Sequence, residues 1–222
     1  MQFTEYVSKQ IEPAIEDISS LSENSRKHIQ KLIFTNVVNQ FDIMIDNMIL
    51  NNVRYYSIYN YLSSKMTKTI TEQELINMLI DYENITNAII ERLKTAAKEA
   101  VLRQRHSLKL KFLLESLNLK DYITKRPMVQ AGTGKVDKDV KQTKVKVPQS
   151  LLGYADWLYS RRNGIVHGSS SNVYLENDRQ QLKKLYDFEC PKRLQITIGS
   201  TKNAVTFYTN IVEIIQHQIH TI

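Results

Sequence analysis

Apolar residues recur every three or four positions over long stretches of the chain, and this spacing predicts helices. The clearest case lies between Ser25 and Asn51, where large apolar side chains share one face and predict a long core helix. Asp42 falls at the edge of this stripe and Asp46 follows one turn later. A half-buried acid at the edge of the stripe is expected either to pair with a cation or to be a solvated residue at the helix edge. The members of the stripe are Phe34, Val37, Val38, Phe41, Ile45 and Met48.

Further helices are expected at residues 3–20, in part of 172–188, and at 203–220. Thr71 and Glu74 have the spacing of a helix-capping box, and the helix that they begin is expected to run with little interruption to Leu117. Its second half carries four cations within an arc of about 60°. We interpret them as a basic ridge that tracks phosphates, with a merely solvated face as the alternative. They are Lys94, Lys98, Arg105 and Lys109.

Two stretches depart from the helical pattern. Residues 126–149 are rich in lysine and poor in large apolar side chains, which predicts a mobile basic loop or short ribbon. It is a candidate substrate clamp or a tolerated insertion. Residues 143–147 alternate in polarity and permit a strand, whereas residues 194–198 alternate cleanly and predict a short strand, expected to pair with the lysine-bearing loop in a small ribbon. Taken together, the pattern predicts an all-α class: one helical bundle domain over residues 1–222, with a basic excursion.

Composition narrows the classes of function. The chain has 222 residues, a formal net charge of +7 and a pI near 9.3, which suits an anionic partner such as RNA. Cys190 is the only cysteine, so the chain can form no internal disulfide, and a reducing cytosol is expected. No long apolar run indicates a membrane span. We therefore expect a cytoplasmic protein without a membrane anchor.

The candidate chemistry gathers in residues 161–168, Arg-Arg-Asn-Gly-Ile-Val-His-Gly. Leu151, Ala155 and Leu158 have the spacing of a buried helix stripe. Arg162 continues this stripe one turn further, so it is expected to face the interior. There it needs either a carboxylate or an anionic ligand. Asn163 and His167 share a helix face, and the amide can orient the imidazole. About 140° separate Arg162 from His167 on an ideal helix.

The two glycines of this motif are expected to bring its arginine and histidine together. Gly164 loosens the segment, and Gly168 is a natural left-handed helix stop, followed by turn-forming residues at 169–172. A purely structural alternative remains open, in which Arg162 bridges to an acid and His167 complements the helix C-terminus.

This motif resembles the signature of the HEPN superfamily, small α-helical domains whose ribonuclease members carry an arginine, a following polar residue and a nearby histidine. The resemblance implies a bacterial endoribonuclease of a toxin–antitoxin or defence system. It further implies a homodimer with two motifs facing one cleft, and a cognate antitoxin or defence partner protein. It also implies that an acid on the long core helix approaches Arg162; Asp42 is the candidate and Asp46 its rival. A non-catalytic module that binds nucleotide, RNA or protein is the alternative.

RNA cleavage through the 2′-hydroxyl requires only two functions of such a site, because the RNA supplies its own nucleophile. A histidine moves protons near neutral pH, and an arginine stabilises the charge that develops on the phosphate. We therefore assign His167 as acid and base, Arg162 as the phosphate clamp and Asn163 as the orienting residue. Arg161 adds positive charge for substrate binding. The scheme calls for neither a metal nor a cofactor.

Overall fold

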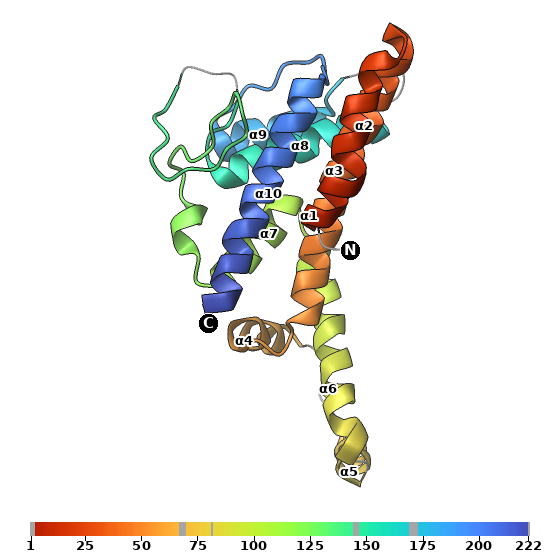
Figure 1. The fold of residues 1–222 in the computed structure, drawn as a ribbon. Coiled ribbons are helices and arrows are strands. Elements are labelled where there is room, and N and C mark those ends of the chain that lie inside the picture. The colour runs from red at the N-terminus through yellow and green to blue at the C-terminus, as the bar shows by residue number, and fades with distance from the viewer. Residues whose placement is uncertain (1–2, 67–69, 81, 144–146, 169–172, 222) are drawn as a thin grey trace.

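The structure is a computed structural model that describes residues 3–66, 70–80, 82–143, 147–168 and 173–221 (Figure 1). Every regular element in these ranges is a helix, and the only β-type contacts there are two isolated antiparallel bridges. The all-α class is therefore confirmed. The α-helices are α1 (Phe3–Tyr6), α2 (Glu12–Asp17), α3 (Glu23–Asn51), α4 (Tyr56–Lys65), α5 (Glu72–Ile80), α6 (Tyr82–Ala97), α7 (His106–Ser116), α8 (Leu151–His167), α9 (Glu176–Tyr186) and α10 (Ile198–Thr221).

The predicted core helix is α3, and it forms the centre of the bundle. It begins after Ser22, whose hydroxyl accepts a hydrogen bond from the backbone N–H of Ser25. The predicted stripe from Phe34 to Ile45 is buried and Met48 is partly buried. Helices α8 and α10 pack against α3, and α7 lies against both α3 and α8. A single apolar cluster runs from Phe3 through α3 to Ile215 of α10.

The closing helix begins earlier than predicted. Residues 194–197 form no strand, and α10 starts at Ile198 instead of residue 203. The apolar residues of this segment are nevertheless buried in alternation, because Leu194 and Ile196 lie in the core. However, the carbonyl of Gln195 accepts a hydrogen bond from the Arg161 side chain rather than from a neighbouring strand.

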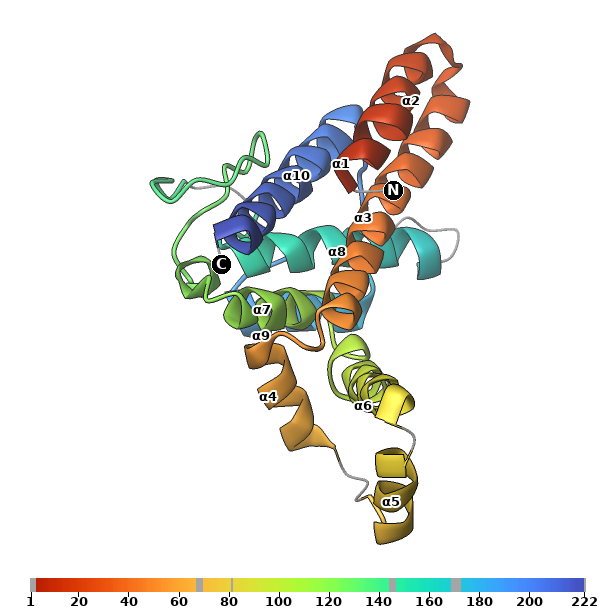
Figure 2. The same cartoon turned by 60° about the horizontal axis from the view of Figure 1, so that its bottom comes forward.

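The predicted helix from Thr71 to Leu117 is wrong, although its start is confirmed. The backbone N–H of Thr71 donates to the Glu74 carboxylate, and that of Glu74 donates to the Thr71 hydroxyl. The chain then divides into α5, α6 and α7, with a π-helical turn at Lys98–Leu102 before α7 restarts at His106. Helices α5 and α6 form an arm that projects from the bundle, with α5 at its tip (Figure 1, Figure 2).

The basic segment 126–149 is anchored where it is described. Val129 is buried, its backbone donates to the carbonyl of Gln149, and it forms a bridge with Val136. Gly134 has a φ of 76° and lies so close to the Asn203 carbonyl of α10 that a Cβ would overlap it. The ribbon predicted between residues 143–147 and 194–198 does not form in the described residues, and 144–146 lie outside them.

Among the helices described here, none is long and apolar enough to cross a membrane. This finding agrees with the absence of a long apolar run in the sequence.

Candidate functional site

The Arg-Asn-Gly-Ile-Val-His motif lies in the last two turns of α8. This helix contains the predicted apolar stripe and begins after Ser150, whose hydroxyl caps it by accepting from the backbone N–H of Gly153. Most of α8 is buried between α3, α7 and α9. The motif therefore sits on a rigid helix rather than on a loop.

Of the two adjacent arginines, Arg161 is buried and Arg162 is only half-buried, whereas Arg162 was predicted to face the interior. Arg161, expected to bind substrate, is only 5% exposed, and its guanidinium lies over the rings of Trp157 (4.5 Å to the centroid) and Phe34 (5.2 Å). It donates to the carbonyl of Gln195 and to the hydroxyl of Ser200, 3.0 Å away. Burial lowers the pKa of Arg161. It is a structural cation that ties α8 to the start of α10.

Arg162 is half-buried and its guanidinium contacts neutral oxygens. Its Nε donates to Oδ1 of Asn39 on α3 at 2.7 Å, and its Nη1 donates to Oδ1 of Asn163 at 3.1 Å. The ring of Tyr159 lies 5.7 Å from the guanidinium carbon. Within the described ranges, no carboxylate forms an ion pair with Arg162. A half-buried arginine whose charge is not offset in this way is suited to an anionic ligand.

Asn163 bonds Arg162 and an acid instead of the imidazole that it was expected to orient. Its Nδ2 donates to Oδ2 of Asp178 in the first turn of α9, at 3.2 Å. Burial raises the pKa of Asp178, while the Asn163 hydrogen bond and the charges of Arg105 and His167 oppose that rise. His167, the last residue of α8, is exposed and lies within electrostatic range of this carboxylate. The predicted hydrogen bond from Asn163 to His167 is absent.

The glycines of the motif serve packing and do not loosen the helix. Gly164 is buried inside α8, where an added Cβ would lie 2.9 Å from the carbonyl oxygen of Val173. Gly168 caps α8 with a φ of −74°, so the predicted left-handed stop is wrong. Because α8 stays helical through His167, the separation of about 140° between Arg162 and His167 remains. The predicted turn at 169–172 lies outside the described residues.

Asp42 belongs to a separate polar cluster and does not approach Arg162. Its Oδ1 is 2.8 Å from Nδ1 of His106 and 2.7 Å from Nζ of Lys109 on α7. Burial alone would raise the pKa of Asp42, but the bonds from His106 and Lys109 lower it to about 2. Asp46, the rival, pairs with the same lysine at 2.7 Å. The position expected for an acid beside Arg162 is held by Asn39, one turn before Asp42.

The predicted basic ridge is not a single surface. Arg105 turns inward to the buried Asp156 (2.9 Å), and Lys109 is buried between its two acids. Lys94 pairs with Glu91, which leaves Lys98 as the exposed member without an ion pair in the described chain. The turn between α6 and α7 changes the helical phase, so the calculated arc of one continuous helix does not apply.

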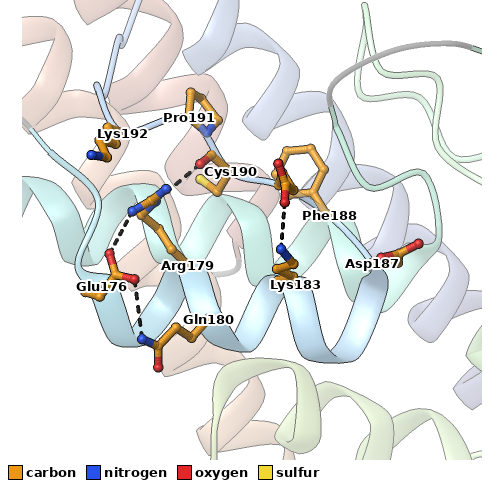
Figure 3. Close-up of a pocket in the computed structure, with 10 residues that line it drawn as sticks. Glu176, Arg179, Gln180, Lys183, Asp187, Phe188, Cys190, Pro191 and Lys192 are labelled. Atoms are coloured by element: carbon orange, nitrogen blue, oxygen red, sulfur yellow. Dashed lines mark hydrogen bonds and ion pairs between the residues drawn. The ribbon is translucent and has the colours of Figure 1, made fainter.

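A depression of about 780 Å³ lies along α9 and the loop that follows it (Figure 3), and neither Arg162 nor His167 belongs to the residues that line it. Two of its three cations are paired: Arg179 contacts Glu176 at 2.7 Å, and Lys183 contacts Glu189 at 2.7 Å, while the formal charge of Lys192 is balanced by that of Asp187. This depression therefore lacks an unbalanced charge for an anionic substrate.

Three residues next to the motif were missed by sequence reasoning: Asn39, Tyr159 and Asp178. Asn39 and Asp178 are brought there by the packing of α3 and α9 against α8, whereas Tyr159 lies on α8 itself, one turn before Asn163. In the described part of the chain, no three His, Cys, Asp or Glu side chains gather as a metal site.

Comparisons with protein-family models, curated proteins and solved structures found no match to this chain. The functional argument therefore rests on the residues and their geometry.

Proposed function

We propose that the protein is a metal-independent endoribonuclease of the HEPN type, with Arg162 and His167 as its catalytic residues. The observation that carries the proposal is the half-buried Arg162 guanidinium, held by the neutral amides of Asn39 and Asn163. A phosphate of RNA supplies the negative charge that this site does not receive from an ion pair. The formal charge of +7 favours such a polyanion.

RNA brings its own nucleophile to this site. The 2′-oxygen attacks the adjacent phosphorus, its proton passes to a base, the bond to the 5′-oxygen breaks, and that oxygen takes up a proton. His167 acts as the proton-transfer group, and Arg162 stabilises the charge on the phosphate oxygens as the new bond forms. Asn163 positions the Arg162 side chain.

A second copy completes the site. In one chain Arg162 and His167 point about 140° apart around α8. One imidazole also cannot conveniently serve at both the attacking and the leaving oxygen. Two copies related by a two-fold axis at the motif face would supply two imidazoles to one cleft. The homodimer is thus part of the proposal.

The biological setting that the HEPN resemblance implies is a bacterial toxin–antitoxin or antiviral defence system. In that setting a cognate antitoxin or defence partner protein would cover the exposed His167 end of α8. This part of the proposal rests on the resemblance alone.

A non-catalytic RNA- or nucleotide-binding module is the second candidate. It is favoured by the exposed His167 ring, which the predicted Asn163 bond does not orient. In that case Arg162 would bind phosphate without turnover.

The test is RNA cleavage in the presence of EDTA by the wild type and three variants. His167→Ala should abolish cleavage, whereas His28→Ala, which removes an exposed histidine of α3, should cleave like the wild type. Arg162→Ala should lose cleavage and weaken RNA binding. RNA binding without cleavage by the wild type would establish the module instead, and loss of cleavage on adding EDTA would overturn the metal-independent mechanism.

A further inference from the structure

Helix α5, at the tip of the arm, carries an apolar stripe that the rest of the described chain does not cover. Leu75, Ile76, Leu79 and Ile80 are 46%, 49%, 59% and 80% exposed. On a helix these four positions fall within an arc of about 140°, so they form one face. None of the residues of α5 is buried, although the helix packs on α6.

The exposed apolar area of this stripe is larger than that of the single apolar residues scattered over an ordinary protein surface. Ile70, directly before α5, and Ile89 of α6 add two more aliphatic side chains to the arm, 39% and 42% exposed. The six exposed portions together amount to on the order of 500 Å² of apolar surface. A standard interface buries roughly 800 Å² per partner, of which about two thirds is apolar in homodimers. The arm therefore offers about the apolar area that one such interface needs.

The charges of the arm exclude two classes of occupant. Residues 70–92 contain five acids and one base in a chain that is otherwise strongly basic. Two of the acids, Glu72 and Glu74, lie in the first turn of α5. Acidic groups beside the stripe disfavour RNA and anionic membrane surfaces, which are attracted by lysine and arginine. The arm therefore suits a protein surface, and an aliphatic stripe is complementary to a copy of itself.

We propose that α5 packs against α5 of a second copy, antiparallel about a two-fold axis. The nine residues of α5 span about 13 Å. An antiparallel arrangement therefore sets the two pairs of glutamates at opposite ends of the contact, beyond one Debye length at physiological salt. The four aliphatic side chains of each copy interdigitate between them, and α6 of each copy flanks the contact. This interface lies on the arm, not on the motif face, and does not depend on the proposed function.

Two experiments on the full-length chain test the proposal. In the first, Ile76→Cys places a thiol at the middle of α5, next to its symmetry mate. Copper-phenanthroline, as the oxidant, should take two electrons from the paired thiols, release two protons and join the copies by a disulfide. The matched control is Leu185→Cys, on α9, where the native side chain is 47% exposed. Cys190 is buried and common to both proteins. Rapid cross-linking of Ile76→Cys alone supports the proposal, and equal or absent cross-linking overturns it.

In the second experiment, sedimentation measures the mass of Leu79→Lys/Ile80→Lys beside the control Leu185→Lys. The double variant should have a lower weight-average mass than the wild type: it becomes a monomer where the arm is the sole contact, and it stops at a dimer where the motif face also assembles. Unchanged circular dichroism would show that the bundle still folds. A wild type that is monomeric at tens of micromolar would overturn the proposal. So would a double variant of unchanged mass, and if that variant also lost RNA binding, the arm would be an RNA-binding surface instead.

Discussion

Asp42→Asn should destabilise the protein in a pH-dependent way without disabling the site. In the folded chain the pKa of Asp42 falls from 3.8 to about 2, because the bonds from His106 and Lys109 outweigh the effect of burial. That fall corresponds to about 2 kcal/mol of folding free energy. A depressed carboxyl pKa stabilises the fold above the unfolded-state pKa, and this contribution is lost as the pH falls through the folded-state value.

Urea unfolding followed by circular dichroism measures this contribution as the difference between wild type and Asp42→Asn. The difference should be about 2 kcal/mol at pH 6 and fall to about half by pH 3. Burial raises the pKa of Asp178, a contribution of opposite sign, but it is common to both proteins and largely cancels. The control is Asp121→Asn, whose exposed pair with Lys138 should contribute less than about 1 kcal/mol.

The same variant separates a structural acid from a catalytic one. Because Asp42 bonds His106 and Lys109 and not Arg162, folded Asp42→Asn should cleave RNA at close to the wild-type rate. A stability difference that is the same at pH 6 and pH 3 would refute the origin of its depressed pKa. Full stability with lost cleavage would return Asp42 to the catalytic site.

Three further changes have expected outcomes. Gly134→Ala should lower the free energy of unfolding by about 1–3 kcal/mol, because its φ is 76° and its Cβ would overlap the backbone of α10; Gly132→Ala, with open space around it, should stay within about 0.5 kcal/mol in the same urea titration. Asp178→Asn should keep the bond to Asn163 through its amide oxygen but slow RNA cleavage several-fold, because it removes the negative charge near His167; a wild-type rate would count against that role. Lys98→Glu should reduce the log–log salt dependence of RNA binding by at most about one, since the other three cations of the predicted ridge are paired; a larger change would restore the ridge.

Local patterns predicted much of the fold because they depend on residues close in sequence. The stripe of α3, the stripe of α8 from Leu151 to Leu158 and the capping box at Thr71 all follow from spacings within a few turns. The helix break before α7 was not predicted, because the residues at the break contact partners on helices that are distant in sequence. Arg105 binds Asp156 and His106 binds Asp42, and nothing in residues 98–106 alone indicates these partners.

The site was predicted in part for the same reason. The motif identified Arg162 and His167 as candidates, but the prediction that Arg162 rather than Arg161 faces the core was wrong. Helix α8 is buried on several sides, so the apolar stripe does not show which of two adjacent residues, about 100° apart around the helix, is buried. Aromatic rings and the Gln195 carbonyl make the interior acceptable for Arg161. Asn39 and Asp178 reach the motif from α3 and α9, so only the packing of three helices identifies them.

The most direct test of the central claim compares an RNA with a 2′-O-methyl RNA of the same sequence, both in EDTA. We predict that the wild type cleaves the RNA to products ending in a 2′,3′-cyclic phosphate and leaves the 2′-O-methyl strand intact, and that His167→Ala cleaves neither. Equal cleavage of the two strands would contradict attack by the 2′-oxygen, and cyclic-phosphate products from His167→Ala at the wild-type rate would contradict the assignment of His167.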